Sequence, residues 1–190
     1  FVYRFEKGEI NALIATADDN VCADAEVAEK KVAPLKAKII VKGKRDNWSA
    51  FDDEIVKFSD KFERPEGDEA THKDDIMLMY FTSGTTGYPR IVMQPFSYPI
   101  GHLVTAKYWH NVDPNGLHFT ISDTGWAKSV WGKLYGQWLC ESAILTYDFE
   151  RFCASDILSL FAKYQITTFC APPTMYRFFI KEDLTKFDLS

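Results

Sequence analysis

The chain has 190 residues, of which 46% are apolar and 15% aromatic, so it can bury a sizeable core in one large or two small domains. The formal net charge is −5, and the whole acidic excess falls within residues 1–75, which is typical of a solvated surface and not of a nucleic-acid partner. The sequence shows neither an apolar run of membrane-spanning length nor a signal peptide, so we expect no membrane span.

Residues 1–74 predict an N-terminal α/β portion that ends in a charged linker. In chain order we expect a strand at 12–15, a helix at 22–33, a strand at 37–41 and a helix that opens at Asn47. The strand–helix–strand alternation is typical of a parallel α/β unit. The second helix is predicted because Phe51, Ile55 and Phe58 recur at steps of three to four residues. Residues 63–74 are charged and contain a proline and a glycine, which indicates a surface linker.

Residues 75–190 predict a hairpin and a second α/β portion, which together with residues 1–74 would form parts of one truncated domain. Apolar strands at 76–81 and 91–93 flank the hairpin loop. The later elements expected, in chain order, are a helix at 97–109, a strand at 117–121, a helix at 126–139, a strand at 143–147, a helix at 152–164, a strand at 167–170 and a helix at 173–180. This alternation indicates mostly parallel sheets covered by helices, and therefore an α/β fold class.

The hairpin loop carries the most informative residues of the chain. Residues 80–90 read Tyr-Phe-Thr-Ser-Gly-Thr-Thr-Gly-Tyr-Pro-Arg. The glycines let the backbone approach an anion closely, and successive N–H groups can form an anion-binding concavity. The threonine and serine side chains add further donors. The loop is therefore suited to a polyphosphate.

The same loop does not fit the P-loop of nucleotide triphosphatases. That motif needs two glycines five residues apart, followed by lysine and a hydroxyl residue. Here Gly84 and Gly87 are three apart, and Tyr88 and Pro89 follow. A P-loop also leads into a helix, whose N-terminus faces the phosphates, whereas residues 91–93 read as a strand.

Residues 82–90 resemble the signature loop of the AMP-forming adenylating enzymes, whose pattern is Thr/Ser-Ser-Gly-Thr-Thr-Gly-x-Pro-Lys. The chain departs from it at the last position, where Arg90 stands in place of lysine. The resemblance implies that the ATP phosphates are held by Thr82, Ser83, Gly84, Thr85, Thr86, Gly87 and Arg90, with Thr85 and Arg90 as the catalytic residues. Two roles stay open for Arg90, because it could grip pyrophosphate at two points or only shield charge at the end of the loop.

Two later segments resemble acyl-CoA synthetases. Residues 122–128 are similar to the Asp-x-Gly-Trp segment of acetyl-CoA synthetase and the medium-chain acyl-CoA synthetases, and residues 169–177 resemble the segment that leads toward the acyl pocket. The resemblance implies a substrate pocket that includes Trp126, Ala171 and Pro172. The alternatives are that Trp126 belongs to the core, as tryptophans more often do, and that residues 171–172 form a simple strand-to-helix turn.

The resemblance further implies a reaction in two halves. A carboxylate, medium-chain or aromatic, attacks the α-phosphate of ATP, and the resulting acyl-adenylate passes its acyl group to coenzyme A. The expected partners are therefore the carboxylate, ATP, Mg²⁺ and coenzyme A, with no metal ligand in this chain and the magnesium, adenine and ribose sites beyond Ser190. We expect the 190-residue chain to be an inactive fragment of such a ligase.

Two alternative functions stay open: an adenylation domain that loads a carrier protein, and a non-catalytic nucleotide-binding relic. The four cysteines are widely spaced and lack a Cys-x-x-Cys pair, which indicates reduced thiols and a cytoplasmic protein. The resemblance to acyl-CoA synthetases implies a role in fatty acid metabolism. The four histidines lack metal-ligand spacing, so none is given a role.

Overall fold

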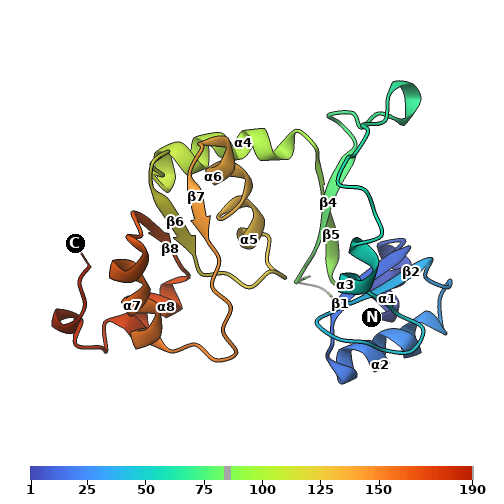
Figure 1. The fold of residues 1–190 in the computed structure, drawn as a ribbon, viewed down its shortest axis with the longest axis horizontal. Coiled ribbons are helices and arrows are strands. Elements are labelled where there is room, and N and C mark those ends of the chain that lie inside the picture. The colour runs from blue at the N-terminus through green and yellow to red at the C-terminus, as the bar shows by residue number, and fades with distance from the viewer. Residues whose placement is uncertain (84–86, 190) are drawn as a thin grey trace. The chain divides into compact units, whose positions relative to one another are not determined.

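The computed structural model describes residues 1–83 and 87–189 and confirms the α/β fold class (Figure 1). The chain divides into two compact units. Unit 1 comprises Phe1–His72 and Met79–Met93, and unit 2 comprises Lys73–Leu78 and Gln94–Ser190. A two-stranded hairpin contributes to both units.

Unit 1 is built on a sheet of three parallel strands in the order β1-β2-β3. The strands are β1 (Ala12–Thr16), β2 (Ala37–Val41) and β3 (Ser49–Ala50), and the helices are α1 (Val2–Lys7), α2 (Asp19–Glu29) and α3 (Phe51–Ile55). The helix α2 connects β1 to β2 and lies alongside their sheet (Figure 1). The core of the unit consists of Phe5, Cys22, Ala25, Ala28, Ile40 and Trp48.

The helix α2 begins three residues before the position that the sequence predicted. The side chain of Asp18 accepts hydrogen bonds from the backbone N–H groups of Asn20 and Val21, both at 3.0 Å, and so caps the first turn. Small residues at positions 22, 25 and 28 share the buried face, which lets the helix approach the sheet closely. The helix also ends at Glu29, before the residue 33 that was predicted.

The helix expected to open at Asn47 is wrong in its start and its length. Asn47 has a φ of 63°, which asparagine tolerates better than most residues, and Ser49–Ala50 then pairs with β2 as a short strand. Only Phe51–Ile55 is helical. The apolar residues that suggested the pattern, Phe51, Ile55 and Phe58, are all exposed, so their spacing does not mark a buried face. No sequence pattern predicted α1, in which Phe5 is the one buried residue.

The strands β4 (Ile76–Thr82) and β5 (Arg90–Pro95) pair as the expected hairpin. Beyond their ends, the N–H of Phe96 donates to the carbonyl of Asp75 at 3.0 Å. The charged segment 63–74 is largely exposed and contains a 3-10 turn at Gly67–Glu69.

Unit 2 contains a second parallel sheet in the order β7-β6-β8. Its elements are α4 (Tyr98–Val104), which continues as a π-helical segment at Thr105–Trp109, β6 (Leu117–Thr120), α5 (Lys128–Trp131), α6 (Tyr135–Leu139), β7 (Ala143–Leu145), α7 (Ala154–Tyr164), β8 (Thr168–Cys170), α8 (Pro173–Phe179) and a 3-10 turn at Leu184–Lys186.

Alternate residues of the central strand β6 face opposite sides of this sheet. Phe119 packs into the main core with Ile157 and Leu160 of α7. His118 and Thr120 point to the other side, where both hydrogen-bond to the carbonyl of Gly132 between α5 and α6. The strand thus carries an apolar core on one face and a buried polar cluster on the other.

The single helix predicted at 126–139 is wrong, because the structure breaks it into α5 and α6. At the break, the carbonyl of Gly132 accepts hydrogen bonds from the side chains of Thr120 and Gln137 and contacts His118. These side chains satisfy the carbonyl where the helical ladder stops. The expected ends of β7 and α7 also shift, since β7 ends at Leu145 and α7 begins at Ala154.

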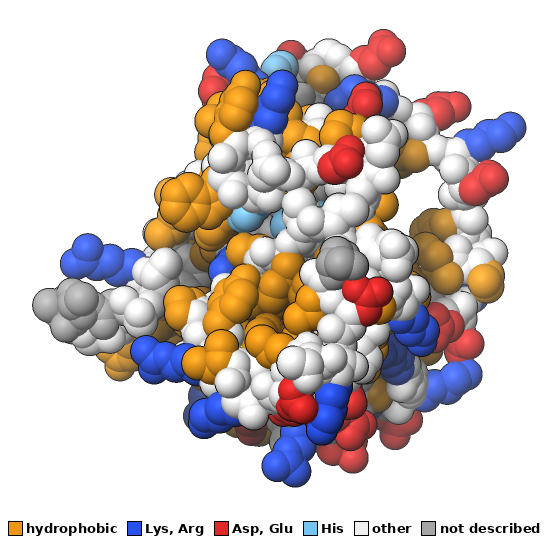
Figure 2. All heavy atoms as spheres, turned by 90° about the vertical axis from the view of Figure 1, so that its left-hand side faces the viewer, with side chains coloured by type: hydrophobic (Ala, Val, Ile, Leu, Met, Phe, Trp, Pro, Cys, Tyr) orange, Lys and Arg blue, Asp and Glu red, His pale blue; other side chains and the backbone are white. Residues whose placement is uncertain are grey.

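Hydrophobic side chains gather on the face of the molecule that Figure 2 shows. In unit 2 the exposed apolar residues include Tyr176, Phe178 and Ile180, on α8 and at its C-terminal end. The opposite side of α8 is buried, because Phe179 belongs to the core with Phe119 and Ile157.

Candidate active site

The described part of the signature loop is accessible to solvent. Thr82 is the last residue of β4, Ser83 follows it, and Arg90 is the first residue of β5. Thr82, Ser83, Gly87 and Arg90 are all exposed. The Oγ1 of Thr82 donates a long hydrogen bond, 3.4 Å, to the carbonyl oxygen of Arg90, so the two residues face each other across the hairpin. The predicted phosphate ligands Gly84, Thr85 and Thr86 lie outside the described residues.

Gly87 has a backbone conformation that favours glycine. Its φ is 134°, a region that L side chains rarely adopt, while a Cβ built there would meet no atom within 4 Å. The requirement at this position is therefore conformational and not a matter of space.

The two predicted pocket segments lie at one edge of the unit 2 sheet. The segment with Trp126 follows β6, and Ala171 and Pro172 follow β8, which pairs with β6 in parallel. The N–H of Ile121 donates to the carbonyl of Cys170 at 2.9 Å, so the two strands stay paired up to the point where these segments begin. In open α/β sheets, ligands bind outside the carboxyl ends of the strands.

Within this edge the pocket residues differ in exposure. Trp126 is 71% exposed, so it is not a core residue of unit 2, whereas Ala171 is buried against α7. Asp123 shapes the turn before Trp126, because its Oδ1 accepts from the N–H of Gly125 at 2.7 Å and its carbonyl from the N–H of Trp126 at 3.1 Å. Pro172 precedes the first turn of α8.

The polar cluster behind β6 contains three histidines to which the sequence assigned no role. The ring of Trp131 stacks on His102 and His110, with centroids 5.8 and 6.1 Å apart, and His110 lies 5.4 Å from His118. Spacing gave no hint of this cluster, because its members come from α4, β6 and the segment between them.

His118 is fully buried and bonded on both ring nitrogens. Its Nδ1 lies 2.7 Å from the hydroxyl of Thr168, and its Nε2 lies 2.8 Å from Thr120 Oγ1 and 3.2 Å from the Gly132 carbonyl oxygen. A carbonyl only accepts, so the proton belongs on Nε2, and a neutral ring satisfies every bond. The pKa of His118 is lowered to about 4, mainly by burial, with smaller contributions from the nearby His110 and Lys133.

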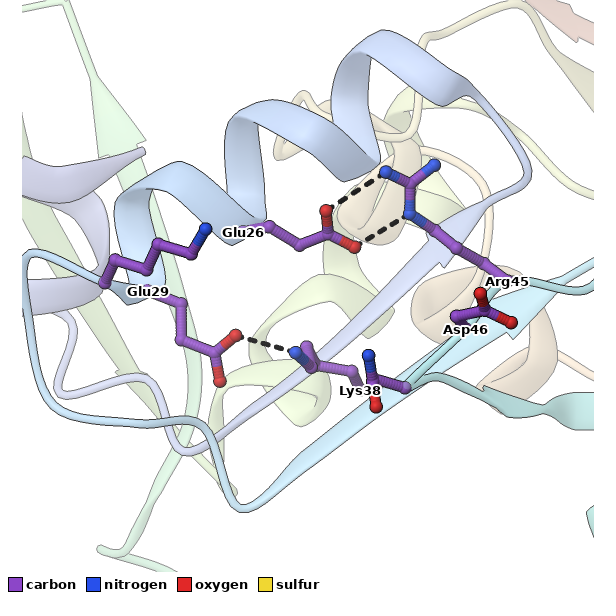
Figure 3. A pocket seen from close by; sticks show the side chains of 7 residues that line it. Glu26, Glu29, Lys38, Arg45 and Asp46 are labelled. Carbon is purple, nitrogen blue, oxygen red and sulfur yellow. Dashed lines mark hydrogen bonds and ion pairs between the residues drawn. The ribbon is translucent and has the colours of Figure 1, made fainter.

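Unit 1 contains a hollow that is lined by ion pairs (Figure 3). Arg45 donates to Glu26 through Nε at 2.8 Å and Nη2 at 3.0 Å, and Lys38 donates to Glu29 at 2.7 Å. Glu26 also accepts from the indole N–H of Trp48 at 2.8 Å. The hydrogen bonds from Arg45 and Trp48 lower the pKa of Glu26 to about 2. Two of the three cations that line the hollow, Lys38 and Arg45, are already paired with carboxylates, which favours a structural network over a phosphate site.

Replacing Glu26 by alanine should lower the free energy of unfolding by about 2 kcal/mol, because the indole N–H of the buried Trp48 and the Arg45 guanidinium lose their acceptor. Urea unfolding of the purified protein measures the change. The matched control is Glu54→Ala, which removes an exposed ion pair with Lys57 and should change the free energy by less than about 1 kcal/mol. Equal effects of the two substitutions would contradict the structural role of Glu26.

Among residues 1–83 and 87–189 the structure holds no group of three or more histidine, cysteine or carboxylate residues that could bind a metal ion. In the same part of the chain, no helix is both long enough and apolar enough to cross a membrane.

The fold is that of the adenylate-forming enzymes. The chain superposes on the crystal structure of the anthranilate CoA ligase AuaEII in complex with anthranoyl-AMP with a TM-score of 0.83 and 21% identity, covering 100% of this chain and 36% of that one. The luciferase-like enzyme from the nonluminescent mealworm Zophobas morio gives a TM-score of 0.77 at 16% identity, covering 100% of this chain and 42% of that one.

The sequence family follows from a match along the whole chain. The family model for AMP-binding enzymes matches residues 1–190, so the chain belongs to the AMP-binding enzyme family. Relatives include the mitochondrial acyl-coenzyme A synthetase ACSM3 of Homo sapiens, 30% identical over 98% of this chain, and 4-hydroxybutyrate–CoA ligase 1 of Metallosphaera sedula, 34% identical over 97%. The chain spans 31% of the length of each of these two relatives.

Proposed function

We propose that the chain supplies the pyrophosphate-binding loop and part of the acyl pocket of an AMP-forming acid–thiol ligase. The observation that carries the proposal is the hairpin of β4 and β5, where the described loop residues Thr82, Ser83 and Gly87 are exposed and Gly87 has a φ of 134°. The membership of the AMP-binding enzyme family supports it. So do the two relatives, whose names describe acyl-CoA ligases.

In this proposal the loop stabilises charge that builds up on phosphate oxygens. A carboxylate oxygen bonds to the α-phosphorus of ATP as the bond to the bridging oxygen breaks, and the electron pair leaves with pyrophosphate. Thr82, Ser83 and the amide of Gly87 would donate to the β- and γ-phosphates, and Arg90 would neutralise the leaving pyrophosphate. The same role is proposed for Gly84, Thr85 and Thr86, which lie outside the described residues.

In the second half, the sulfur of coenzyme A would attack the acyl carbon and AMP would leave. Mg²⁺ bound together with ATP would supply further stabilisation of charge on the phosphate oxygens. The thiol acceptor is tested by incubating the complete protein with ATP and a carboxylate, with and without coenzyme A. We expect an acyl-CoA thioester to form in step with AMP. Adenylate that accumulates and ignores coenzyme A would favour the alternative, a domain that loads a carrier protein.

We propose that the acid is medium-chain or aromatic and that it binds at the carboxyl ends of β6 and β8. The exposed indole of Trp126 would form one wall, and the segment with Ala171 and Pro172 would form another. The name of AuaEII describes an aromatic acid as its substrate, whereas the name of the Metallosphaera enzyme describes a short hydroxy acid. The two names thus describe acids of different size.

Replacing Trp126 by alanine in the complete protein should change the preference between acids of different length by about tenfold, because a missing wall deepens the pocket. The measurement is kcat/KM for acids of increasing chain length. Trp138→Ala is the matched control, since Trp138 is an exposed tryptophan on α6 and not at the strand ends. An identical preference profile for Trp126→Ala and the unchanged protein would rule out the pocket role.

We also propose that the complete protein is cytoplasmic. The cysteine pattern favours a cytoplasmic location, and all four cysteines are free thiols. The name of the ACSM3 relative describes a mitochondrial enzyme. Imaging of the complete, tagged protein in cells decides between the two compartments.

A further inference from the structure

The first helix of the chain touches the base of the signature loop. The Tyr3 hydroxyl in α1 donates a hydrogen bond of 2.8 Å to the carbonyl oxygen of Pro89. The Tyr3 ring stacks on the ring of Tyr88, with centroids 4.8 Å apart and planes 16° apart. The same ring meets Phe81 edge to face at 6.4 Å. Phe81 directly precedes the loop and Tyr88 lies near the loop's end. The side chain of Tyr3 therefore contacts both sides of the base of the loop.

Neighbours of Tyr3 fix its helix in place. The next residue, Arg4, lies over the ring of Phe81 at 5.4 Å from its centroid. The residue after that, Phe5, is buried in the core of unit 1 with Cys22 and Ala25. The helix α1 is therefore anchored to the core by Phe5 while Tyr3 and Arg4 reach the hairpin.

The hydrogen bond to Pro89 restrains more than one atom. A peptide group is planar, so holding the carbonyl oxygen of Pro89 also fixes the orientation of the N–H of Arg90. Arg90 is the residue proposed to meet pyrophosphate. On the other side, Tyr88 follows Gly87, and glycine has more backbone freedom to lose than any other residue. An external anchor at Tyr88 and Pro89 therefore reduces the number of conformations open to the end of the loop.

We propose that Tyr3 is a positioning residue for ATP: it holds the Tyr88–Pro89 end of the signature loop so that Arg90 is oriented before the nucleotide binds. This inference rests on the proposed function. Tyr3 acts through the loop and does not touch the substrate. Its loss should therefore weaken the use of ATP and leave the binding of the carboxylate unchanged, because the acid is proposed to bind at the ends of β6 and β8.

Two substitutions in the complete protein separate the contributions of the hydroxyl and the ring. Tyr3→Phe keeps the ring contacts and removes the hydrogen bond, and we expect the KM for ATP to rise about fivefold, as the loss of one hydrogen bond implies. Tyr3→Ala removes both, and we expect a rise of about thirtyfold. The KM for the carboxylate should stay within twofold in both variants. Tyr108→Ala, at an exposed tyrosine of unit 2, is the matched control and should change neither KM.

The KM values distinguish positioning from a purely structural role. A variant that is only less stable contains less active protein, so its apparent kcat falls while both KM values stay the same. That outcome would overturn the proposal, as would an equal rise in both KM values. Tyr3→Phe guards against the case in which Tyr3→Ala does not fold.

A second measurement tests the anchor without any catalysis. Hydrogen exchange of the peptide that contains the amides of Gly87, Tyr88 and Arg90 should be faster in Tyr3→Phe than in the unchanged protein, because the base of the loop loses its restraint. Unchanged exchange would overturn the anchor. Hydrogen exchange that is faster in Tyr3→Phe than in the unchanged protein would support the anchor. If the unchanged protein then shows no activity with any acid, the anchor stands and the proposed function fails.

Discussion

Arg90→Ala in the complete protein should lower the rate of carboxylate-dependent ATP–pyrophosphate exchange by about 10²-fold. Arg90 opens β5 beside the loop, is exposed, and faces Thr82 across the hairpin. A cation at this place would stabilise charge on the leaving pyrophosphate, and removing one such group typically costs about 10²- to 10³-fold in rate. The measurement is exchange at saturating carboxylate and varied ATP.

Two control substitutions test whether the effect is specific to position 90 and whether it depends on charge alone. Arg90→Lys restores a cation and the residue of the family pattern, so it should recover most of the lost rate if charge alone matters. If Arg90 grips pyrophosphate at two points, lysine cannot replace the fork and the rate should stay low. Arg64→Ala removes an exposed arginine from the linker and should leave the rate unchanged. An Arg90→Ala protein as fast as the unchanged one would exclude any role in catalysis.

The protein should lose about 2 kcal/mol of stability between pH 7 and pH 5 through His118 alone. The pKa of His118 is about 4 in the folded state and about 6.5 in the unfolded state. Below pH 6.5 the unfolded chain binds a proton that the folded chain excludes, so this contribution is fully present above pH 6.5 and falls as pH drops toward 4. Burial also lowers the pKa values of His102 and His110, which adds loss in the same direction.

Urea unfolding at several pH values tests this prediction, followed by tryptophan fluorescence because Trp131 stacks on two of the histidines. His118→Gln removes the titrating ring and keeps a group that can both donate and accept, so its stability should vary less between pH 7 and pH 5. The lowered pKa of Glu26 acts at lower pH, between about 4.5 and 2, and does not interfere. Identical pH slopes for the two proteins would contradict the account of the cluster.

The sequence predicted the strands of this fold better than its helix boundaries. The strands β1, β2, β4, β6 and β8 lie where apolar, β-branched runs predicted them, because such runs have few other ways to be buried. The boundaries that failed depend on tertiary contacts. The break before α6 arises from side chains of β6 that bond to Gly132, and the pattern of Phe51, Ile55 and Phe58 describes residues that the structure leaves exposed.

The candidate site also has features that the local sequence predicted and features that depend on tertiary contacts. The hairpin and the need for a glycine at position 87 could be predicted, because they depend on residue types that are adjacent in the chain, while the phosphate-binding role of the loop stays a prediction. Tyr3 could not be predicted, because it lies 86 residues before Pro89 and a tyrosine in a short helix has no distinctive pattern. The polar cluster that contains His118 was missed for a similar reason, since its members come from separate elements: Thr168 bonds to His118, and Gln137 bonds to His110 and to the Gly132 carbonyl.

The central claim is that the loop between β4 and β5 belongs to an enzyme that activates a carboxylate with ATP. Carboxylate-dependent ATP–pyrophosphate exchange by the complete protein, with a panel of short, medium-chain and aromatic acids, tests it most directly. We expect radiolabel from pyrophosphate to enter ATP only when a suitable acid is present, with the highest rate for a medium-chain or aromatic one. A complete, folded protein that exchanges no label with any of these acids would contradict the account.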